Sequence, residues 1–142
     1  MIEDQIKNGI LARLSEIDPE LPLYDEQIKQ GFTEPAFFVL QVNSGQTRGV
    51  NRRYIRSLLF NVHFFPDPKS LTKKEDCRAI AERLYEAMVY VEVDGQLCRG
   101  LDHRYEVIDD VLHFFVGFTV HLMKTADQVP KMQQLEQEGY LK

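Results

Sequence analysis

The chain has 142 residues, is 44% hydrophobic and 27% charged, and carries a formal net charge of −5. Such a composition predicts a soluble globular domain, and the net acidity argues against a protein that coats duplex DNA, because phosphate neutralisation dominates that binding. The longest apolar stretch, residues 111–123, is interrupted by His113 and His121 and is too short to span a bilayer.

The first thirty residues begin with a predicted amphipathic helix over residues 2–17. Proline in the following segment, residues 18–22, should end the helix, because proline cannot continue its hydrogen-bond ladder. We expect no secretory signal in the acidic, polar start of the chain, so Cys77 and Cys98 should be reduced packing residues. A short strand is expected at Leu23–Tyr24. The apolar stripe of the helix consists of Ile2, Ile6, Ile10, Leu14 and Ile17.

The middle of the chain predicts a β-hairpin made of residues 36–42 and 53–65. The residues between these strands, 43–51, are rich in Gly and Asn and predict the turn region. Alternation with period two places the apolar side chains of each strand on one face. On the first strand these are Ala36, Phe38, Leu40 and Val42, and on the second they are Tyr54, Leu58, Phe60, Val62 and Phe64.

A second helix is predicted within residues 70–91, with Thr72 and Glu75 at capping-box spacing. A second hairpin follows, with strands 98–108 and 111–123 joined by a tight turn at Asp109–Asp110. The predicted fold class is therefore α+β: an antiparallel or mixed sheet of about four strands with two helices packed on one face and a long hairpin arm. Residues 1–125 should form one domain, and residues 126–142 a polar C-terminal extension. The second helix has the stripe Cys77, Ile80, Ala81, Leu84, Met88 and Val91.

The sequence offers no recognisable catalytic, cofactor or metal motif. His113 and His121 face the same way but lie too far apart on one strand to share a metal, whereas His63 and His113 lie on different strands that could bring them together. No carboxylate or cysteine lies at ligand spacing beside them, so solvated histidines are the simpler interpretation. The pair Asp109–Asp110 is explained by the tight turn rather than by acid–base chemistry. We expect no enzyme, no cofactor and no metal site.

Strand length and charge are the unusual features of the chain. Residues 53–65 and 111–123 predict strands longer than the usual 3 to 10 residues. Either they bend at a bulge within a closed monomer, with Gly117 a candidate, or one end overhangs and can pair with another chain. Residues 31–66 contain four arginines and a single acid, Glu34, whereas residues 1–30 contain seven acids and three bases. Arginines are costly to bury alone, so we expect them in water or against an acidic partner such as the first thirty residues.

Several segments of the chain resemble the tail terminator family of contractile-tailed phages and phage-derived tail particles. These segments are "YDEQIKQGFTEPAFFVLQVNSGQTR", "RRYIRSLLFNVHFFPD", "LYEAMVYVEVDGQLCRG", "VIDDVLHFFVGFTVHL" and "MQQLEQEG". One departure is Asp110, where the family pattern leads us to expect glycine. The resemblance implies a structural protein of the virion, assembled in the host cytoplasm as a ring, typically a hexamer, on the head-proximal end of the tail. Such a ring ends tube polymerisation, engages the last sheath ring and presents the surface that meets the head.

The residues expected to contact a neighbouring subunit or the tube end belong to two segments. The hairpin segment follows from strand length, charge and the resemblance, and the C-terminal segment from its few apolar residues, although a frayed terminus is an equal alternative. Expected partners are other copies of the chain, the tail tube protein, the tail sheath protein and a head–tail connector. No membrane is expected, and DNA would be met only as it passes the lumen. The candidate interface residues are Arg48, Arg52, Arg53, Tyr54, Arg56, Met132 and Leu135.

Two other functions remain open at this point. A head–tail adaptor or other neck ring would have the same ring assembly at a different position. A small hydrolase or ligand-binding domain would instead require a concave pocket with convergent polar groups.

Overall fold

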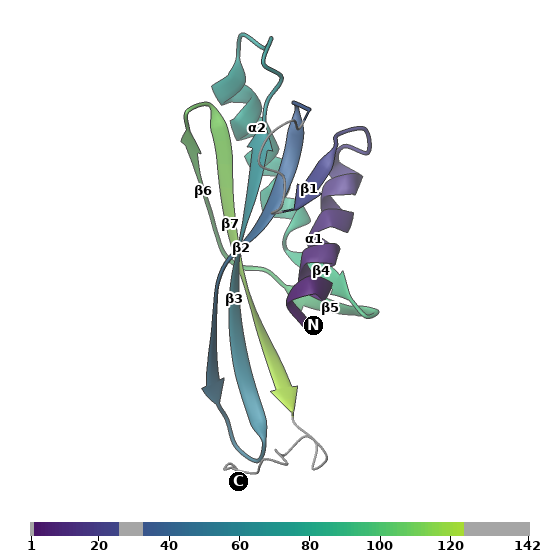
Figure 1. Cartoon of the computed structure of the whole chain (residues 1–142), viewed down its shortest axis with the longest axis vertical. Helices are drawn as coiled ribbons and strands as arrows, with labels where there is room; N and C mark the ends of the chain where they lie inside the picture. Colours follow the sequence, from purple (N-terminus) through teal and green to yellow (C-terminus); the bar gives the residue numbers. More distant parts are fainter. Residues whose placement is uncertain (1, 26–32, 124–142) are drawn as a thin grey trace. The chain divides into compact units, whose positions relative to one another are not determined.

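A computed structural model describes residues 2–25 and 33–123 of the chain, which form an α+β fold (Figure 1). The chain divides into two compact units. We call the first unit the body, which comprises the described residues up to Asn43 together with Leu58–Phe118. The second unit is the arm, Ser44–Ser57 with the described residues after Phe118. Each unit is described separately below.

Nine elements follow one another along the described residues. A five-stranded sheet has the strand order β1-β2-β3-β7-β6, and β4 and β5 form a separate two-stranded ribbon. Neither helix of the described residues is long and apolar enough to cross a membrane. The elements are α1 (Ile2–Ile17), β1 (Leu23–Asp25), β2 (Ala36–Arg48), β3 (Arg53–Phe65), α2 (Lys73–Ala87), β4 (Tyr90–Val93), β5 (Gln96–Arg99), β6 (Leu101–Ile108) and β7 (Val111–Met123).

The predicted strand 98–108 is in fact two strands, β5 and β6, separated at Gly100. A Cβ atom at Gly100 would collide with the carbonyl oxygen of Met88, so the backbone passes the C-terminal end of α2 too closely for any other residue. β5 pairs with β4, and β6 pairs with β7. The sheet therefore has one strand more than the four expected, because the short β1 also joins it in parallel with β2.

The bulge in this part of the sheet lies in β6 and not at Gly117. Leu101 pairs with Gly117 and Arg104 with Phe115, so β6 has one extra residue over this interval. Asp102 lies within the interval and has a φ of 55°. β7 accordingly runs as a continuous strand over its 13 residues.

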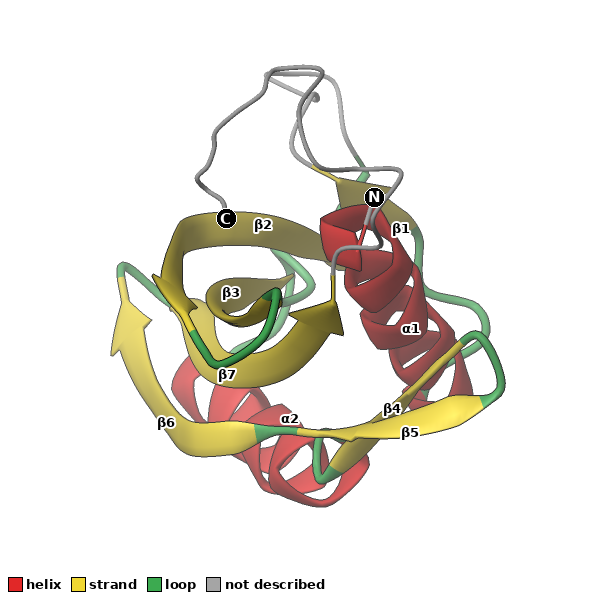
Figure 2. Ribbon diagram, turned by 90° about the horizontal axis from the view of Figure 1, so that it is seen from below, coloured by secondary structure: helices red, strands yellow, loops and turns green. Residues whose placement is uncertain are grey.

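The core lies between the helices and one face of the five-stranded sheet, and Figure 2 shows both helices on the same side of that sheet. Tyr85 of α2 packs edge-on against Phe114 of β7, with ring centroids 5.3 Å apart, and against Tyr105 of β6 at 6.0 Å. Phe60 and Phe118 meet at 6.1 Å. The predicted stripe of α1 is confirmed in its four buried members, Ile6, Ile10, Leu14 and Ile17.

The first half of β2 is buried on both faces, which the alternation of its sequence did not predict. Phe37 is fully buried and meets the ring of Phe64 at 5.4 Å, while its neighbour Phe38 meets Phe65 at 5.4 Å. Phe38 lies on the other face of β2, where Tyr24 of β1 also covers it, with ring centroids 5.2 Å apart. Val42, expected in the core, is 48% exposed.

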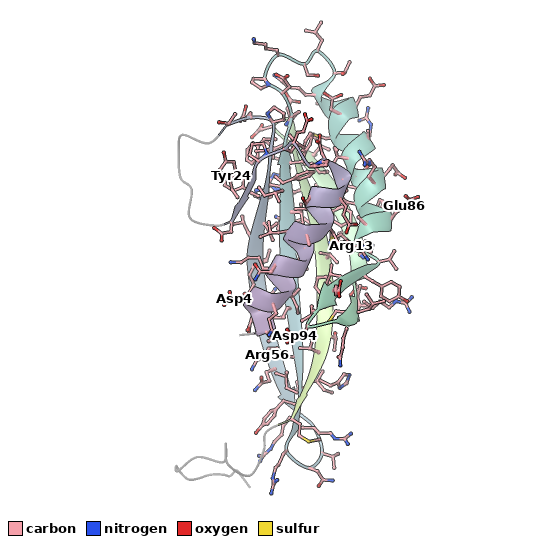
Figure 3. All side chains as sticks on the ribbon, turned by 90° about the vertical axis from the view of Figure 1, so that its right-hand side faces the viewer. Asp4, Arg13, Tyr24, Arg56, Glu86 and Asp94 are labelled. Atoms are coloured by element: carbon pink, nitrogen blue, oxygen red, sulfur yellow. The ribbon has the colours of Figure 1, made fainter. Side chains whose placement is uncertain are left out.

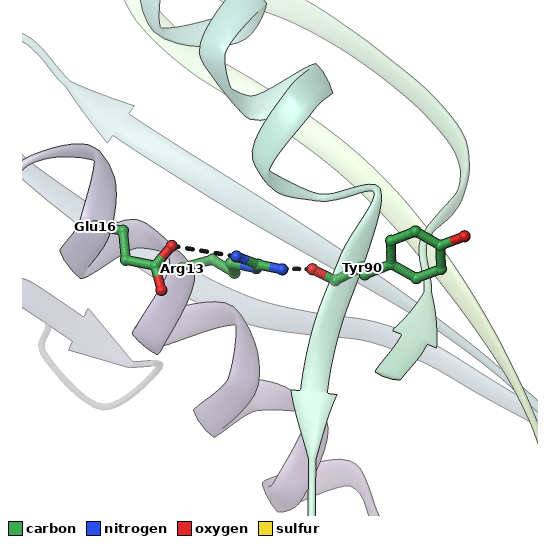
Figure 4. Close-up of polar contacts among 3 residues, drawn as sticks. All are labelled: Arg13, Glu16 and Tyr90. Atoms are coloured by element: carbon green, nitrogen blue, oxygen red, sulfur yellow. Dashed lines mark hydrogen bonds and ion pairs between the residues drawn. The ribbon is translucent and has the colours of Figure 1, made fainter. Parts of the chain in front are cut away.

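Two arginines fix α1 to the rest of the body. Nε of Arg13 donates a hydrogen bond of 2.8 Å to the carbonyl oxygen of Tyr90 in β4, and Nη1 forms an ion pair with Glu16 at 3.2 Å (Figure 4). Nη2 of Arg83 in α2 donates a bond of 2.8 Å to the carbonyl oxygen of Ile17. A cation at the last carbonyls of α1 is favourable because it opposes the helix dipole.

The predicted capping box at the start of α2 does not form. Thr72 occupies the cap position but makes no side-chain cap hydrogen bond. Its hydroxyl donates instead to Oδ1 of Asp76 at 3.1 Å, and the hydroxyl of Ser70 donates to Oδ2 at 2.6 Å. A carboxylate one position later than expected therefore organises this helix start, and Glu75 remains exposed.

Candidate functional site

The tip of the arm is a tight turn between β2 and β3. The amide of Arg53 donates to the carbonyl oxygen of Val50 at 3.1 Å, and the amide of Gly49 donates to the carbonyl oxygen of Arg53 at 2.7 Å. The two central residues have positive φ, 56° at Asn51 and 67° at Arg52, as a type I′ turn requires. β2 therefore continues to Arg48, and the turn is shorter than the predicted region 43–51.

Arg52 occupies a backbone position where glycine is the usual residue. The β4–β5 turn has the favoured pair Asp94–Gly95, whereas the β6–β7 turn has Asp109–Asp110, also at positive φ. The tight turn predicted there is confirmed. Aspartate and asparagine tolerate this conformation because their short polar side chains can hydrogen-bond to the nearby backbone. Arginine lacks this local hydrogen bond, and its positive φ destabilises the turn by about 1 kcal/mol. Arg52 is therefore held in a strained conformation, and such strain is concentrated at functional sites.

The arm brings together the five hairpin residues singled out in the sequence. Arg48, Arg52 and Arg53 are exposed, whereas Tyr54 and Arg56 are half-buried. Nε and Nη2 of Arg56 donate to Oε1 of Gln46 at 2.9 and 2.6 Å, so this guanidinium braces the hairpin. The arginines thus have different roles: Arg56 stabilises the arm, and Arg52 and Arg53 present charge at its tip. Met132 and Leu135 lie outside the described residues.

Charge is separated between the two units. The described part of the arm contains four arginines and no acidic residue. The described part of the body contains 18 acidic and nine basic residues, a net charge of −9. Surfaces of opposite charge on one chain favour association of different copies and increase the rate at which they meet.

Val50 is a tip residue that the sequence reasoning did not single out. Its side chain is 73% exposed, in the turn next to Arg52 and Arg53. The available signal was an apolar residue inside a turn sequence otherwise rich in Gly, Asn and Arg. An apolar side chain surrounded by arginines is a common composition for the centre of a protein interface.

His63 of β3 and His113 of β7 do meet in the body, with ring centroids 4.3 Å apart. Burial, together with the neighbouring His113, lowers the pKa of His63 to about 4, so that His63 is neutral at physiological pH. This half-buried pair differs from the solvated histidines expected. No cluster of three potential metal ligands exists among residues 2–25 and 33–123.

The two cysteines are not activated for chemistry. Cys77 is fully buried against the start of β7, and burial raises the pKa of its thiol to about 11. Burial also raises the pKa of the Cys98 thiol. Reactive cysteines require the opposite shift, because the thiolate is the nucleophile.

Comparison with known proteins identifies a family through sequence rather than through structure. A family model described as "Phage tail terminator protein" matches residues 5–130, a range that includes the described body from residue 5 and the whole hairpin of the arm. No curated protein matches the chain. Among solved structures 23 chains match. One of them is 16% identical, with a match covering 87% of this chain and 96% of that chain, but its TM-score of 0.39 supports no argument.

Proposed function

Because the chain belongs to the phage tail terminator protein family, and is therefore a structural component of a virion tail, we propose that it assembles as a homo-oligomeric ring that caps the tail tube. The ring, typically a hexamer, ends tube polymerisation, engages the last sheath ring of a contractile tail and provides the surface that the head connector meets. It occupies the head-proximal end of the tail and is assembled in the host cytoplasm. It performs no catalysis.

The observation that carries this proposal is the separation of charge between arm and body. A closed ring built from head-to-tail contacts requires two different and complementary surfaces on each subunit. An arm with four arginines and no acid, and a body with twice as many acidic as basic residues, supply such a pair. The arm tip of one subunit contacts the acidic body of the next subunit or the end of the tube.

The arm tip is suited to a protein partner. Arg52 and Arg53 are exposed, Val50 provides an exposed apolar side chain in the same turn, and Arg56 holds the two strands together. Arginine forms bidentate hydrogen bonds with carboxylates, so a matched acidic surface binds with defined orientation. The lumen-facing alternative, contact with passing DNA, would be independent of carboxylates on a neighbouring subunit.

The experiment that tests the proposal replaces Arg52 and Arg53 by glutamate and follows both ring formation and tails. Sedimentation gives the solution mass, and electron microscopy of particles gives tail length and the presence of the cap. We expect the double variant to lose the ring and to give uncapped tails of irregular length. The matched control is Arg99→Glu with Arg104→Glu, the same charge change placed on exposed residues of the body. Normal rings and normal caps from the arm variant would refute the arm's role.

A further inference from the structure

Leu71 is presented to solvent by an ordered loop before α2. Its side chain is 100% exposed. The loop around it is held by hydrogen bonds: the hydroxyls of Ser70 and Thr72 both donate to Asp76, at 2.6 and 3.1 Å, and the amide of Lys69 donates to Asp67 at 2.9 Å. A loop held in one conformation before binding loses less conformational entropy on binding. Leu71 is thus an exposed apolar side chain on an ordered loop, which suits it to act as an anchor in a protein contact.

Three lysines lie near this anchor, together with one exposed carboxylate, Glu75. Lys69 and Lys74 are exposed and Lys73 is half-buried. The nearby carboxylates of Asp67 and Asp76 accept the hydrogen bonds that hold the loop. A surface that receives Leu71 should therefore offer an apolar hollow with an acidic border.

The body contains a hollow of this kind between α1 and the β4–β5 ribbon. It is a shallow groove of about 350 Å³, and none of its lining residues is basic. Gly9, Ala12 and the buried Val93 supply small or apolar side chains, and the exposed Glu92 and Asp94 supply negative charge. Figure 3 shows Asp4, another exposed carboxylate, at the same end of α1 as Asp94.

The loop before α2 and the groove lie at opposite ends of the body. In Figure 1 the loop precedes the start of α2 at one end, and the β4–β5 ribbon lies beside the start of α1 at the other. One chain cannot insert its loop into its own groove. A contact between the two surfaces must join two copies, and it is heterologous, since each copy contributes a different surface.

We propose that Leu71 of one copy inserts into the groove between α1 and the β4–β5 ribbon of a second copy, with Lys73 and Lys74 facing Glu92 and Asp94. This body-to-body contact rests on the proposed ring and adds to the arm contact. It specifies the two surfaces that fix the orientation of each subunit relative to the next one in the ring.

Cross-linking between two proteins that each have one accessible cysteine tests the contact directly. Both proteins carry Cys98→Ser, and the fully buried Cys77 is kept. One protein also has Leu71→Cys and the other has Ala12→Cys, and each is treated with a short bis-maleimide, alone and after mixed assembly. We expect cross-linked dimers only in the mixture. Rings by mass with no cross-link, or equal cross-linking by the Leu71→Cys protein alone, would overturn this contact but not the ring. A chain that stays monomeric at high concentration and on tail tubes would overturn both.

Substitutions provide a second, independent measurement. Leu71→Ala removes an exposed side chain without disturbing the core, and we expect subunit association to weaken about tenfold, as loss of one buried leucine anchor implies. The matched control is Val42→Ala, an apolar residue of β2 that is 48% exposed and lies outside both surfaces. The charge pair is tested by Lys73→Glu with Lys74→Glu, which should be rescued by Glu92→Lys on the partner. Equal association for the Leu71 and Val42 variants would contradict the proposal.

Discussion

Arg56 reaches across the arm hairpin to Gln46, and two nitrogens of its guanidinium donate hydrogen bonds to the same amide oxygen, at 2.9 and 2.6 Å. This contact separates the arginine that supports the arm from the arginines that are displayed at its tip. It also helps a hairpin rich in like charges to keep a defined shape, because the Arg56 guanidinium is hydrogen-bonded within the arm itself.

Replacing Arg56 by lysine should loosen the arm without unfolding the body. Lysine keeps the charge, but its ammonium cannot reproduce the planar fork that reaches Gln46 through two nitrogens. We expect faster amide hydrogen exchange in residues 44–57 and a change in global unfolding free energy below about 0.5 kcal/mol. Gln46→Ala should have the same effect, and the double variant should be no worse than either, because both remove one contact. Additive effects would show that the contact does not brace the arm.

Replacing Arg52 by glycine should separate stability from assembly. Glycine adopts the φ of 67° without the cost that arginine incurs. The free energy of unfolding should therefore be unchanged or higher by up to about 1 kcal/mol. Ring formation should nevertheless weaken, because the variant lacks one charge at the tip. The measurements are calorimetry at fixed protein concentration and sedimentation. A destabilised Arg52→Gly variant with intact rings would reverse this account of the turn.

The contribution of His63 to stability should depend on pH. Its folded pKa of about 4 lies below the ordinary value of 6.5, so between these values the unfolded chain binds the extra proton. The stabilising effect of a neutral His63 is complete above about pH 6.5 and is lost as the pH falls toward 4. Unfolding by urea at pH 7 and pH 4.5, at one protein concentration, should show a smaller loss for His63→Gln than for the parent chain. Carboxylates titrate in both proteins, so the difference between the two isolates the histidine. Parallel pH profiles would count against this assignment.

The regular spacing of apolar residues predicted the helices and most strands, because each of these elements buries one face. The stripe of α1 and the alternation of β7 are read directly from the order of their apolar residues. Phe37 was missed because β2 is buried on both faces where β1 joins it, and two-sided burial erases alternation. The separation of β5 from β6 depends on the close approach of the Gly100 backbone to the carbonyl oxygen of Met88. No periodic pattern in the sequence connects these two residues.

The candidate site divides in the same way. The arginine cluster was visible as charge density in residues 48–56, since composition alone shows it. The bracing by Gln46 and the positive φ of Arg52 depend on how the two strands pair and on the turn type that results. Residues 43–51 were read as loop because Gly45 and Gly49 suggested one, yet the strand runs on to Arg48.

Gly100 offers a test of the boundary between the two sheets. An alanine there would place its Cβ against the carbonyl oxygen of Met88, 2.8 Å from Nε2 of His103 and 2.9 Å from a methyl carbon of Val116. Because one of these neighbours is backbone and another belongs to the core, we expect Gly100→Ala to destabilise the body by about 2 kcal/mol or more. Gly45→Ala is the matched control, since its Cβ would meet nothing within 4 Å. Chemical denaturation of both variants measures the difference. Equal stability would mean that the backbone at residue 100 can move away from the end of α2, and that the division of the predicted strand is not set by the glycine.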